Sequence, residues 1–202
     1  MRRCRSATEE EMVALFLRTE IAAARFRADL LAHLRAMGLP ERVVTCPNLA
    51  NAEENRARRE LLGRYRGYGR DEGLFEGFPK KVRWEWEALT AEEVAQIRYI
   101  DYSYWNELSG GSRLPKDAVP RIHAGIAPFG VSSEWAPHFA EAIAAGAQVP
   151  PMILVAPKED AHLVVLEGHA RLTAYMMRPD ALPAELPALV GYSSEIVRWG
   201  CY

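Results

Sequence analysis

The stretch Val-Val-Leu-Glu-Gly-His-Ala-Arg-Leu-Thr-Ala-Tyr, residues 164–175, decides how this chain is expected to fold. Its apolar run stops at Glu167, a glycine follows at once, and a helical pattern begins after it. Such a run predicts a buried strand, and a glycine allows the backbone to turn sharply into the next element. The stretch therefore predicts a strand-to-helix turn with polar side chains gathered around it.

The segments around this stretch predict a mixed sheet. PPMILVAP (150–157) is a second apolar run, and the short turn EDA separates it from HLVVLE, so the two runs predict a β-hairpin. ALVGY (188–192) and the alternating KVRWEWE (81–87) predict two further strands. With helical patterns between them, these strands indicate an α+β fold, in which a compact mixed sheet with helices occupies residues 71–202.

The first third of the chain predicts helices. Apolar residues recur at helical spacing over residues 9–37, and Thr8 with Glu11 has the spacing of a capping box, so one long helix is predicted there. A second helix is predicted over 51–66, with its arginines on a solvated face. We expect residues 1–70 to form a helical N-terminal extension.

Charge is spread unevenly over the 202 residues. The net charge is −2, but residues 1–70 carry 14 Lys/Arg and 9 Asp/Glu, a local net charge of +5. In this part, YRGYGR (65–70) alternates tyrosine and arginine, a pattern that can stack on bases and contact phosphates. The alternative is a structural loop whose aromatic rings pack on the protein. Because the whole chain is acidic, nucleic acid is the less favoured partner.

Cysteine content and hydropathy indicate the compartment. The three cysteines are widely spaced and form no CxxC pair, which is typical of a reduced protein. The N-terminus has no apolar core of the kind that a signal peptide needs, and no stretch approaches the roughly 20 apolar residues that span a bilayer. We expect a cytoplasmic protein without a membrane segment.

The polar residues at 167–173 are the candidate site. The first N–H groups of a helix have no partners within it and, with the helix dipole, they favour an anion. Arg171 could add a bidentate contact to phosphate oxygens, and His169 could bind phosphate or move a proton. Glu167 could hold Mg²⁺, accept a proton or bind a ribose hydroxyl, and Thr173 adds a hydroxyl. Charged residues are also common at ordinary helix starts, so the residues alone leave both interpretations open.

Other constellations are weaker. The five histidines show no metal-ligand spacing, so no metal ligand is assigned, and neither a Walker loop nor GxSxG occurs.

Residues 80–192, about half of the chain, resemble the ParB/sulfiredoxin superfamily. The order PPMILVAP, HLVVLEGHARLTAY and ALVGY is similar to the order of its strands and its Gly-centred motif, and SRLP (112–115) looks like its first Arg-containing box. Partition proteins of this superfamily carry Gly-Glu-Arg-Arg at the motif, and sulfiredoxins carry Gly-Cys-His-Arg. Glu167, Gly168, His169 and Arg171 are nearest to the Asp-Gly-His-His-Arg of the free-serine kinases, although Ala170 replaces the second His.

The resemblance implies a nucleotide-binding enzyme. It would use ATP or ADP, with CTP as an alternative, and Mg²⁺, and would transfer a phosphoryl group to a small hydroxyl-bearing molecule. Glu167 and His169 would be catalytic, with Asp101 or Glu107 as further candidate bases. The residues expected to contact the nucleotide are Gly168, His169, Arg171, Thr173, Ser112 and Arg113. A ParB-like nucleic-acid-binding or nuclease module and an inert interaction protein are the alternatives.

Overall fold

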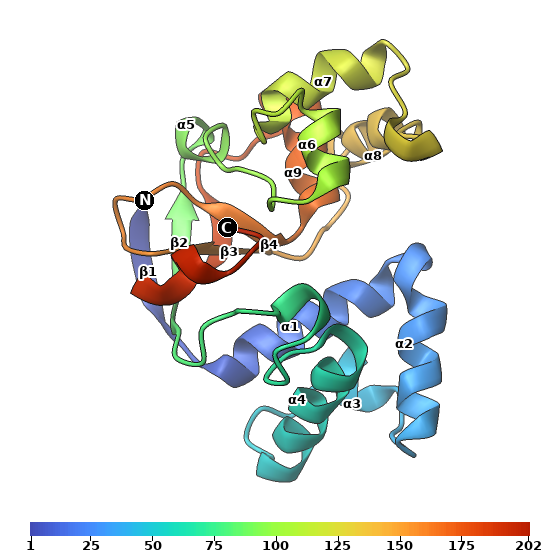
Figure 1. Ribbon diagram of the computed structural model, residues 1–202, viewed down its shortest axis with the longest axis vertical. Helices are drawn as coiled ribbons and strands as arrows, with labels where there is room; N and C mark the ends of the chain where they lie inside the picture. The colour runs from blue at the N-terminus through green and yellow to red at the C-terminus, as the bar shows by residue number, and fades with distance from the viewer.

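The computed structural model describes all of residues 1–202 and shows an α+β protein built on one five-stranded mixed sheet (Figure 1). The strand order is β1-β2-β5-β3-β4, and only β3 and β5 run parallel. The strands are β1 (Arg2–Ala7), β2 (Arg83–Leu89), β3 (Met152–Ala156), β4 (Val164–Glu167) and β5 (Leu186–Tyr192). The predicted hairpin of β3 and β4 and the strands β2 and β5 are confirmed.

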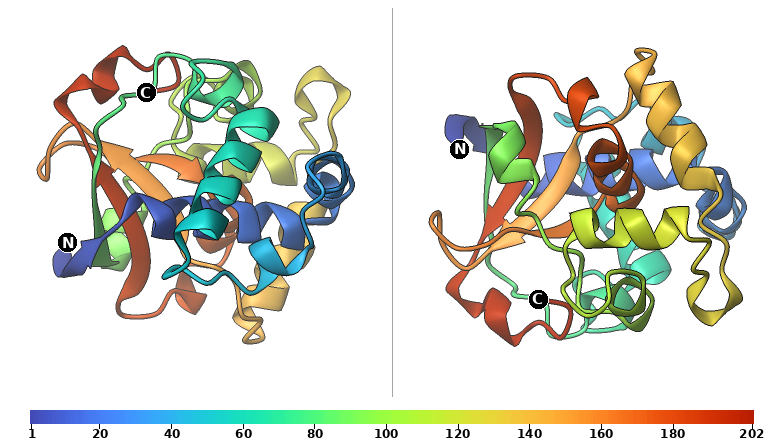
Figure 2. Two further views of the ribbon diagram at one scale, coloured as in Figure 1. Left: turned by 90° about the horizontal axis from the view of Figure 1, so that it is seen from below. Right: turned by 90° about the horizontal axis from the view of Figure 1, so that it is seen from above.

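Helices cover both faces of the sheet (Figures 1 and 2). The helices are α1 (Glu9–Ala22), α2 (Ala24–Ala36), α3 (Arg42–Thr45), α4 (Ala52–Arg66), α5 (Ala91–Val94), α6 (Ser103–Leu108), α7 (Pro115–His123), α8 (Trp135–Ala144) and α9 (His169–Met177). Helices α1 to α4 lie on one side, and α6 to α9 lie on the other. None of these helices is both long enough and apolar enough to cross a membrane.

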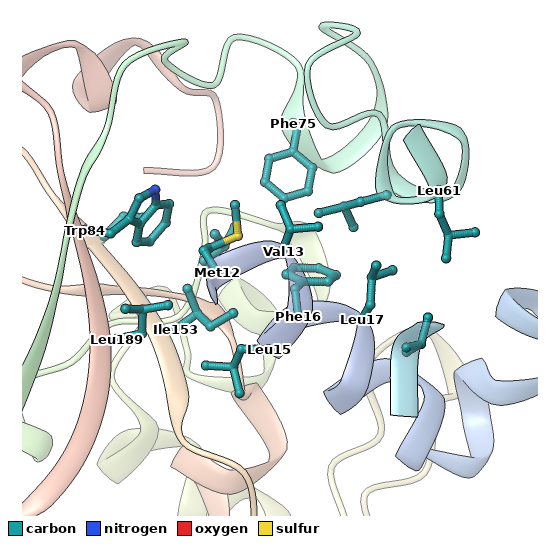
Figure 3. Close-up of a cluster of buried hydrophobic side chains, with 14 of the residues drawn as sticks. Met12, Val13, Leu15, Phe16, Leu17, Leu61, Phe75, Trp84, Ile153 and Leu189 are labelled. Carbon is teal, nitrogen blue, oxygen red and sulfur yellow. The ribbon is translucent and has the colours of Figure 1, made fainter. Parts of the chain in front are cut away.

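The two faces of the sheet build two hydrophobic clusters, because successive side chains of a strand point to opposite faces. On β3, Ile153 and Val155 join the cluster that contains α1, whereas Leu154 joins the cluster that contains α9. Figure 3 shows the first cluster, in which Met12 of α1 lies toward Trp84 and Ile153 of the sheet, and Phe16 lies toward Phe75, 5.8 Å from its ring. Each face is therefore a packed core.

Residues 1–70 are part of this core, so the expected boundary at residue 70 does not describe the packing. Strand β1 pairs with β2 along the edge of the sheet, and α1 lies in the same cluster as three central strands. The sequence of β1, RRCRSA, does not alternate, and five of its six residues are exposed. An edge strand of this kind carries no hydrophobic pattern, which is why the sequence did not predict it.

The single helix expected over 9–37 is wrong, because the chain bends at Ala23, whose backbone is extended (φ −84°, ψ 118°). At a rise of 1.5 Å per residue, an unbroken helix would be about 43 Å long and would leave the core. The bend turns α2 back, so that Leu30 and Leu34 are buried in the same cluster as α1.

Helix α4 was predicted correctly, but one of its arginines does not lie on a solvated face. Arg58 is only 1% exposed, and it donates hydrogen bonds to the backbone carbonyls of Val43 and Asn48, each at 3.1 Å. The guanidinium therefore joins α4 to the segment that precedes it, and it supplies the donor that the buried Val43 carbonyl needs.

Candidate functional site

The β4–α9 turn requires a glycine at position 168. Gly168 has φ +117°, a conformation that other residues rarely adopt. A Cβ atom at this position would lie 2.9 Å from Cγ of Met152 and 3.0 Å from Nη2 of Arg171. The absence of a side chain thus allows both the turn and the close approach of the two neighbours.

The start of α9 has unused hydrogen-bond donors. Its first internal bond runs from the Leu172 N–H to the Gly168 carbonyl at 2.9 Å, and no side chain caps the helix. The N–H groups ahead of Leu172 therefore have no partner within the helix, and the positive end of the helix dipole lies with them. The helix start expected after Gly168 is therefore present, with its first N–H groups unpaired within the helix.

His169 lies in an aromatic stack. Its ring is 5.0 Å from that of Trp105, at an interplanar angle of 15°, and Trp105 in turn stacks on Tyr99 at 4.5 Å. Burial, with a smaller contribution from the nearby Arg171 charge, lowers the pKa of His169 to about 3, so the imidazole is neutral at physiological pH. Its Nε2 atom is buried and has no hydrogen-bond partner.

Glu167 ends β4 and is mostly covered, with 16% of its side chain exposed. Burial raises its pKa to about 7, although Arg171 opposes this shift through its charge and a hydrogen bond of 3.1 Å. A carboxyl that is close to half-ionised at neutral pH is suited to accept and release a proton.

Arg171 uses most of its hydrogen-bond donors within the protein. It is 4% exposed, and its Nη1 atom donates to the backbone carbonyls of Pro150 and, at 2.7 Å, Pro151. With the bond to Glu167, three of the five guanidinium donors are in use. The side chain therefore joins the segment before β3 to the β4–α9 turn and orients Glu167.

Thr173 is fully buried and anchors the first turn of α9. Its hydroxyl donates to the His169 carbonyl at 2.8 Å and lies 2.6 Å from the Tyr99 hydroxyl. Tyr99 is placed there because Arg98 bridges to Val164 of β4: the Arg98 N–H donates to the carbonyl of Leu163, just before β4, and its carbonyl accepts from the Val165 N–H, each at 2.9 Å. Thr173 thus fixes the helix start against the aromatic stack.

The SRLP loop reaches the candidate site only through the backbone of Tyr99. Ser112 makes hydrogen bonds within its own loop, and Arg113 Nε donates to the Tyr99 carbonyl at 2.9 Å. The candidate bases Asp101 and Glu107 lie 3.9 Å from Arg113 and Arg121, respectively. No hydrogen bond or ion pair joins these residues to 167–171, and Arg113 contacts the aromatic stack through the carbonyl of Tyr99.

The N-terminal helices contribute polar groups that the sequence did not indicate. Glu20 of α1 is 2% exposed and accepts hydrogen bonds from the hydroxyl of Tyr65 and, at 2.5 Å, from Nη2 of Arg66. After burial and Arg171, which have larger effects, the charge of Glu20 raises the pKa of Glu167 and that of Arg66 lowers it. The only signal in the sequence is an acidic residue within the otherwise buried face of α1.

The Tyr/Arg segment 65–70 ends α4 at Arg66 and continues as a loop, and its side chains bind the protein itself. The Tyr68 hydroxyl donates to Glu9 at 2.7 Å, and Arg70 donates to Glu60 at 2.5 Å. Its aromatic rings pack on the protein, with Tyr68 4.8 Å from Phe75.

An open groove lies elsewhere on the molecule, with a volume of about 690 Å³. Lys80, Lys81 and Arg83 line it together with Tyr192 and Ser193, and no residue of the β4–α9 turn contributes to it. No group of three or more His, Cys, Asp or Glu side chains is placed to hold a metal ion.

The fold and this turn define an α+β protein with a candidate anion site at a helix start. Comparison with known proteins adds no relative: no family model, no curated protein and no solved structure matches the chain. The similarity to the ParB/sulfiredoxin superfamily therefore stays a prediction from the motif.

Proposed function

We propose that the β4–α9 turn binds a phosphate group of a nucleotide, and that the protein transfers a phosphoryl group from ATP or ADP to a small hydroxyl-bearing molecule. One observation carries this proposal. The start of α9 has unused N–H donors, and the side chain of His169, its first residue, has a buried nitrogen without a partner. Buried polar atoms are nearly always hydrogen-bonded, so an unpaired one beside an anion-favouring helix start suggests a ligand.

The residues at the turn fit a phosphate group. Gly168 adds no side chain above the N–H groups, and a neutral His169 can share a hydrogen bond with a phosphate oxygen. Mg²⁺ would enter bound to the phosphates of the nucleotide, where it neutralises their charge. The two N–H donors of Arg171 that the protein leaves unused could add a further contact.

Glu167 is the proposed proton acceptor. The proton of the acceptor hydroxyl passes to the carboxylate while the hydroxyl oxygen bonds to the transferred phosphorus, and the bond from that phosphorus to the leaving nucleotide oxygen breaks. The bond from Arg171 fixes the orientation of the carboxyl. Its pKa of about 7 allows it to be deprotonated before this step and to release the proton afterwards.

Titration calorimetry of the protein with ATP, ADP and CTP, each with Mg²⁺, tests this proposal. An Ala170→Asp variant would place a carboxylate among the N–H donors, which should preserve or stabilise α9 and abolish nucleotide binding. Ala52→Asp is the matched control, because it adds the same charge at the start of α4, on an exposed residue away from the turn.

We expect at least one of the three nucleotides to bind the unmodified protein and the Ala52→Asp control alike. Failure of all three to bind, or equal binding to the Ala170→Asp variant, would refute the proposal. Duplex DNA binding that falls steeply with salt, without nucleotide binding, would replace it with a nucleic-acid-binding function.

A further inference from the structure

The open groove of about 690 Å³ lies where β2 begins and β5 ends. The antiparallel register pairs Arg83 of β2 with Tyr192 of β5, so the chain just before β2 meets the chain just after β5. Lys80 and Lys81 come from the first of these segments and residues 193–194 from the second, and all four line the groove. Sites for small molecules usually have volumes of about 300–1,000 Å³, so this β2–β5 groove has the size of a ligand site.

The β2–β5 groove lies at the opposite end of the sheet from the β4–α9 turn. Strands β3 and β5 run parallel, and Glu167, which begins the turn, pairs with Ile153 near the start of β3. The groove adjoins the other end of β3, where the carbonyl of Ala156 accepts from the Ser193 N–H at 3.1 Å. At about 3.3 Å per residue, these two ends of β3 are roughly 10 Å apart. A ligand in the groove would therefore occupy a second site.

The acidic side chains of the groove face cations that lie outside it. Glu9 accepts hydrogen bonds from Arg59 at 3.0 Å and from the Tyr68 hydroxyl at 2.7 Å. Glu195 lies 3.9 Å from Arg198. Neither arginine belongs to the lining of the groove, so both negative charges are countered without the groove's own cations.

The aromatic rings of the groove are covered. Trp84 and Tyr192 are only 3% and 5% exposed, and the guanidinium of Arg83 lies 4.9 Å from the centre of the Tyr192 ring. The ring of Tyr68 packs edge-on against Phe75 at 4.8 Å. Proteins that bind single-stranded nucleic acid stack bases on open rings, so the groove is not suited to that ligand.

Two cations and two hydroxyls of the groove remain unused. Lys80 and Lys81 are exposed and make no ion pair or hydrogen bond, whereas Arg83 pairs with the carboxylates of two glutamates. The hydroxyls of Ser193 and Ser194 also make no hydrogen bond. Ammonium groups only donate hydrogen bonds, and hydroxyls can donate them, so this set suits a ligand with several negatively charged oxygen atoms.

We propose that the β2–β5 groove binds a small molecule that carries several phosphate or carboxylate groups. Lys80 and Lys81 neutralise the charge of this molecule, and Ser193 and Ser194 donate hydrogen bonds to its oxygen atoms. Phosphate and carboxylate share this chemistry, because both present negative oxygen atoms to ammonium and hydroxyl donors. The site is separate from the proposed nucleotide site, with which it shares no residue.

Titration of ¹⁵N-labelled protein with inorganic pyrophosphate and, separately, with citrate tests the inference. The titrations are followed by NMR at physiological ionic strength, which screens unspecific attraction between exposed charges. We expect at least one probe to shift the backbone amide signals of Lys81, Ser193 and Ser194. Stronger binding of pyrophosphate would identify phosphate as the charged group of the ligand, and stronger binding of citrate would identify carboxylate.

The double variant Lys80→Gln/Lys81→Gln should bind the probe at least about tenfold more weakly, because it removes both unpaired charges. Both lysines are exposed, so this variant should keep its fold. Arg35→Gln/Lys116→Gln is the matched control, because it removes two exposed charges without ion pairs that lie outside the groove, and its binding should not change.

The location of the shifts separates this inference from the proposed function. The Ala170→Asp variant should still bind the probe in the groove, because position 170 lies at the β4–α9 turn. Shifts confined to residues 168–171 would support the nucleotide site and overturn the inference. No shift with either probe, or equal binding by Lys80→Gln/Lys81→Gln, would overturn it as well.

Discussion

The segment 65–70 and the turn 167–171 contain the same kinds of residue but use them differently. Both combine arginine, an aromatic or imidazole ring and glycine, and both were candidates for phosphate binding. In the first segment, the tyrosine hydroxyls and arginines donate to carboxylates of the protein itself. In the second, Arg171 is largely committed, but the helix-start N–H groups and His169 Nε2 are not.

This difference shows that residue type alone does not mark a site. A ligand needs hydrogen-bonding capacity that the folded chain has left unused, and a carboxylate elsewhere in the chain can use up that capacity. The acidic partners of segment 65–70 lie 10 to 59 positions away, so no local pattern indicates them. The comparison predicts that removing a group that is hydrogen-bonded within the protein changes stability, whereas removing a group without such a partner changes ligand binding.

The largest loss of stability is expected on removal of the Arg171 guanidinium, most of whose donors are hydrogen-bonded within the protein. Arg171→Met would remove the donor of the Pro150 and Pro151 carbonyls and the ion-pair partner of the mostly covered Glu167, and should lower the free energy of unfolding by about 3 kcal/mol. Arg178→Met is the control, because that arginine is 34% exposed and its surface ion pairs should contribute little to stability. Urea denaturation measures both; equal losses would show that Arg171 does not fasten the turn.

A smaller effect is expected from the ionisation of Glu167. Burial raises the pKa of Glu167 to about 7 in the folded protein, so folding favours the protonated carboxyl. The stability that this preference contributes is complete below the unfolded pKa and is lost as the pH rises through 7. Glu167→Gln should therefore be the more stable protein at pH 8, by about 1–3 kcal/mol, and should lose this advantage near pH 4. Unfolding curves of both proteins from pH 4 to 8 measure the difference between their free energies of unfolding. A difference that does not change with pH would show that the carboxyl titrates normally.

The smallest change in stability distinguishes the two regions most directly. His169→Phe keeps a ring for stacking on Trp105 and removes the unpaired nitrogen, so stability should hold or rise by about 1 kcal/mol while nucleotide binding is lost. Tyr65→Phe removes a committed hydroxyl, so stability should fall by about 1 kcal/mol with nucleotide binding retained. Calorimetry and denaturation on both variants check this reversal; the same outcome in the two variants would remove the distinction.

Much of the fold could be predicted because its signals are local. Periodicity indicated strands β2 to β5 and helix α4, and Thr8 with Glu11 forms the capping box that its spacing suggests. The edge strand β1, the bend at Ala23 and the burial of Arg58 were missed. Each depends on what lies opposite in space, which periodicity does not record.

For the candidate site, the sequence by itself determined the turn. The change from an apolar run to a helix start, with glycine at 168, follows from backbone sterics and from the unpaired donors that every helix start carries. Only the tertiary structure decided how the side chains are used: Arg171 binds carbonyls of a distant segment, and His169 lies in an aromatic stack with one nitrogen unpaired. Burial and electrostatic coupling depend on distances in space, and residues far apart in the chain set those distances.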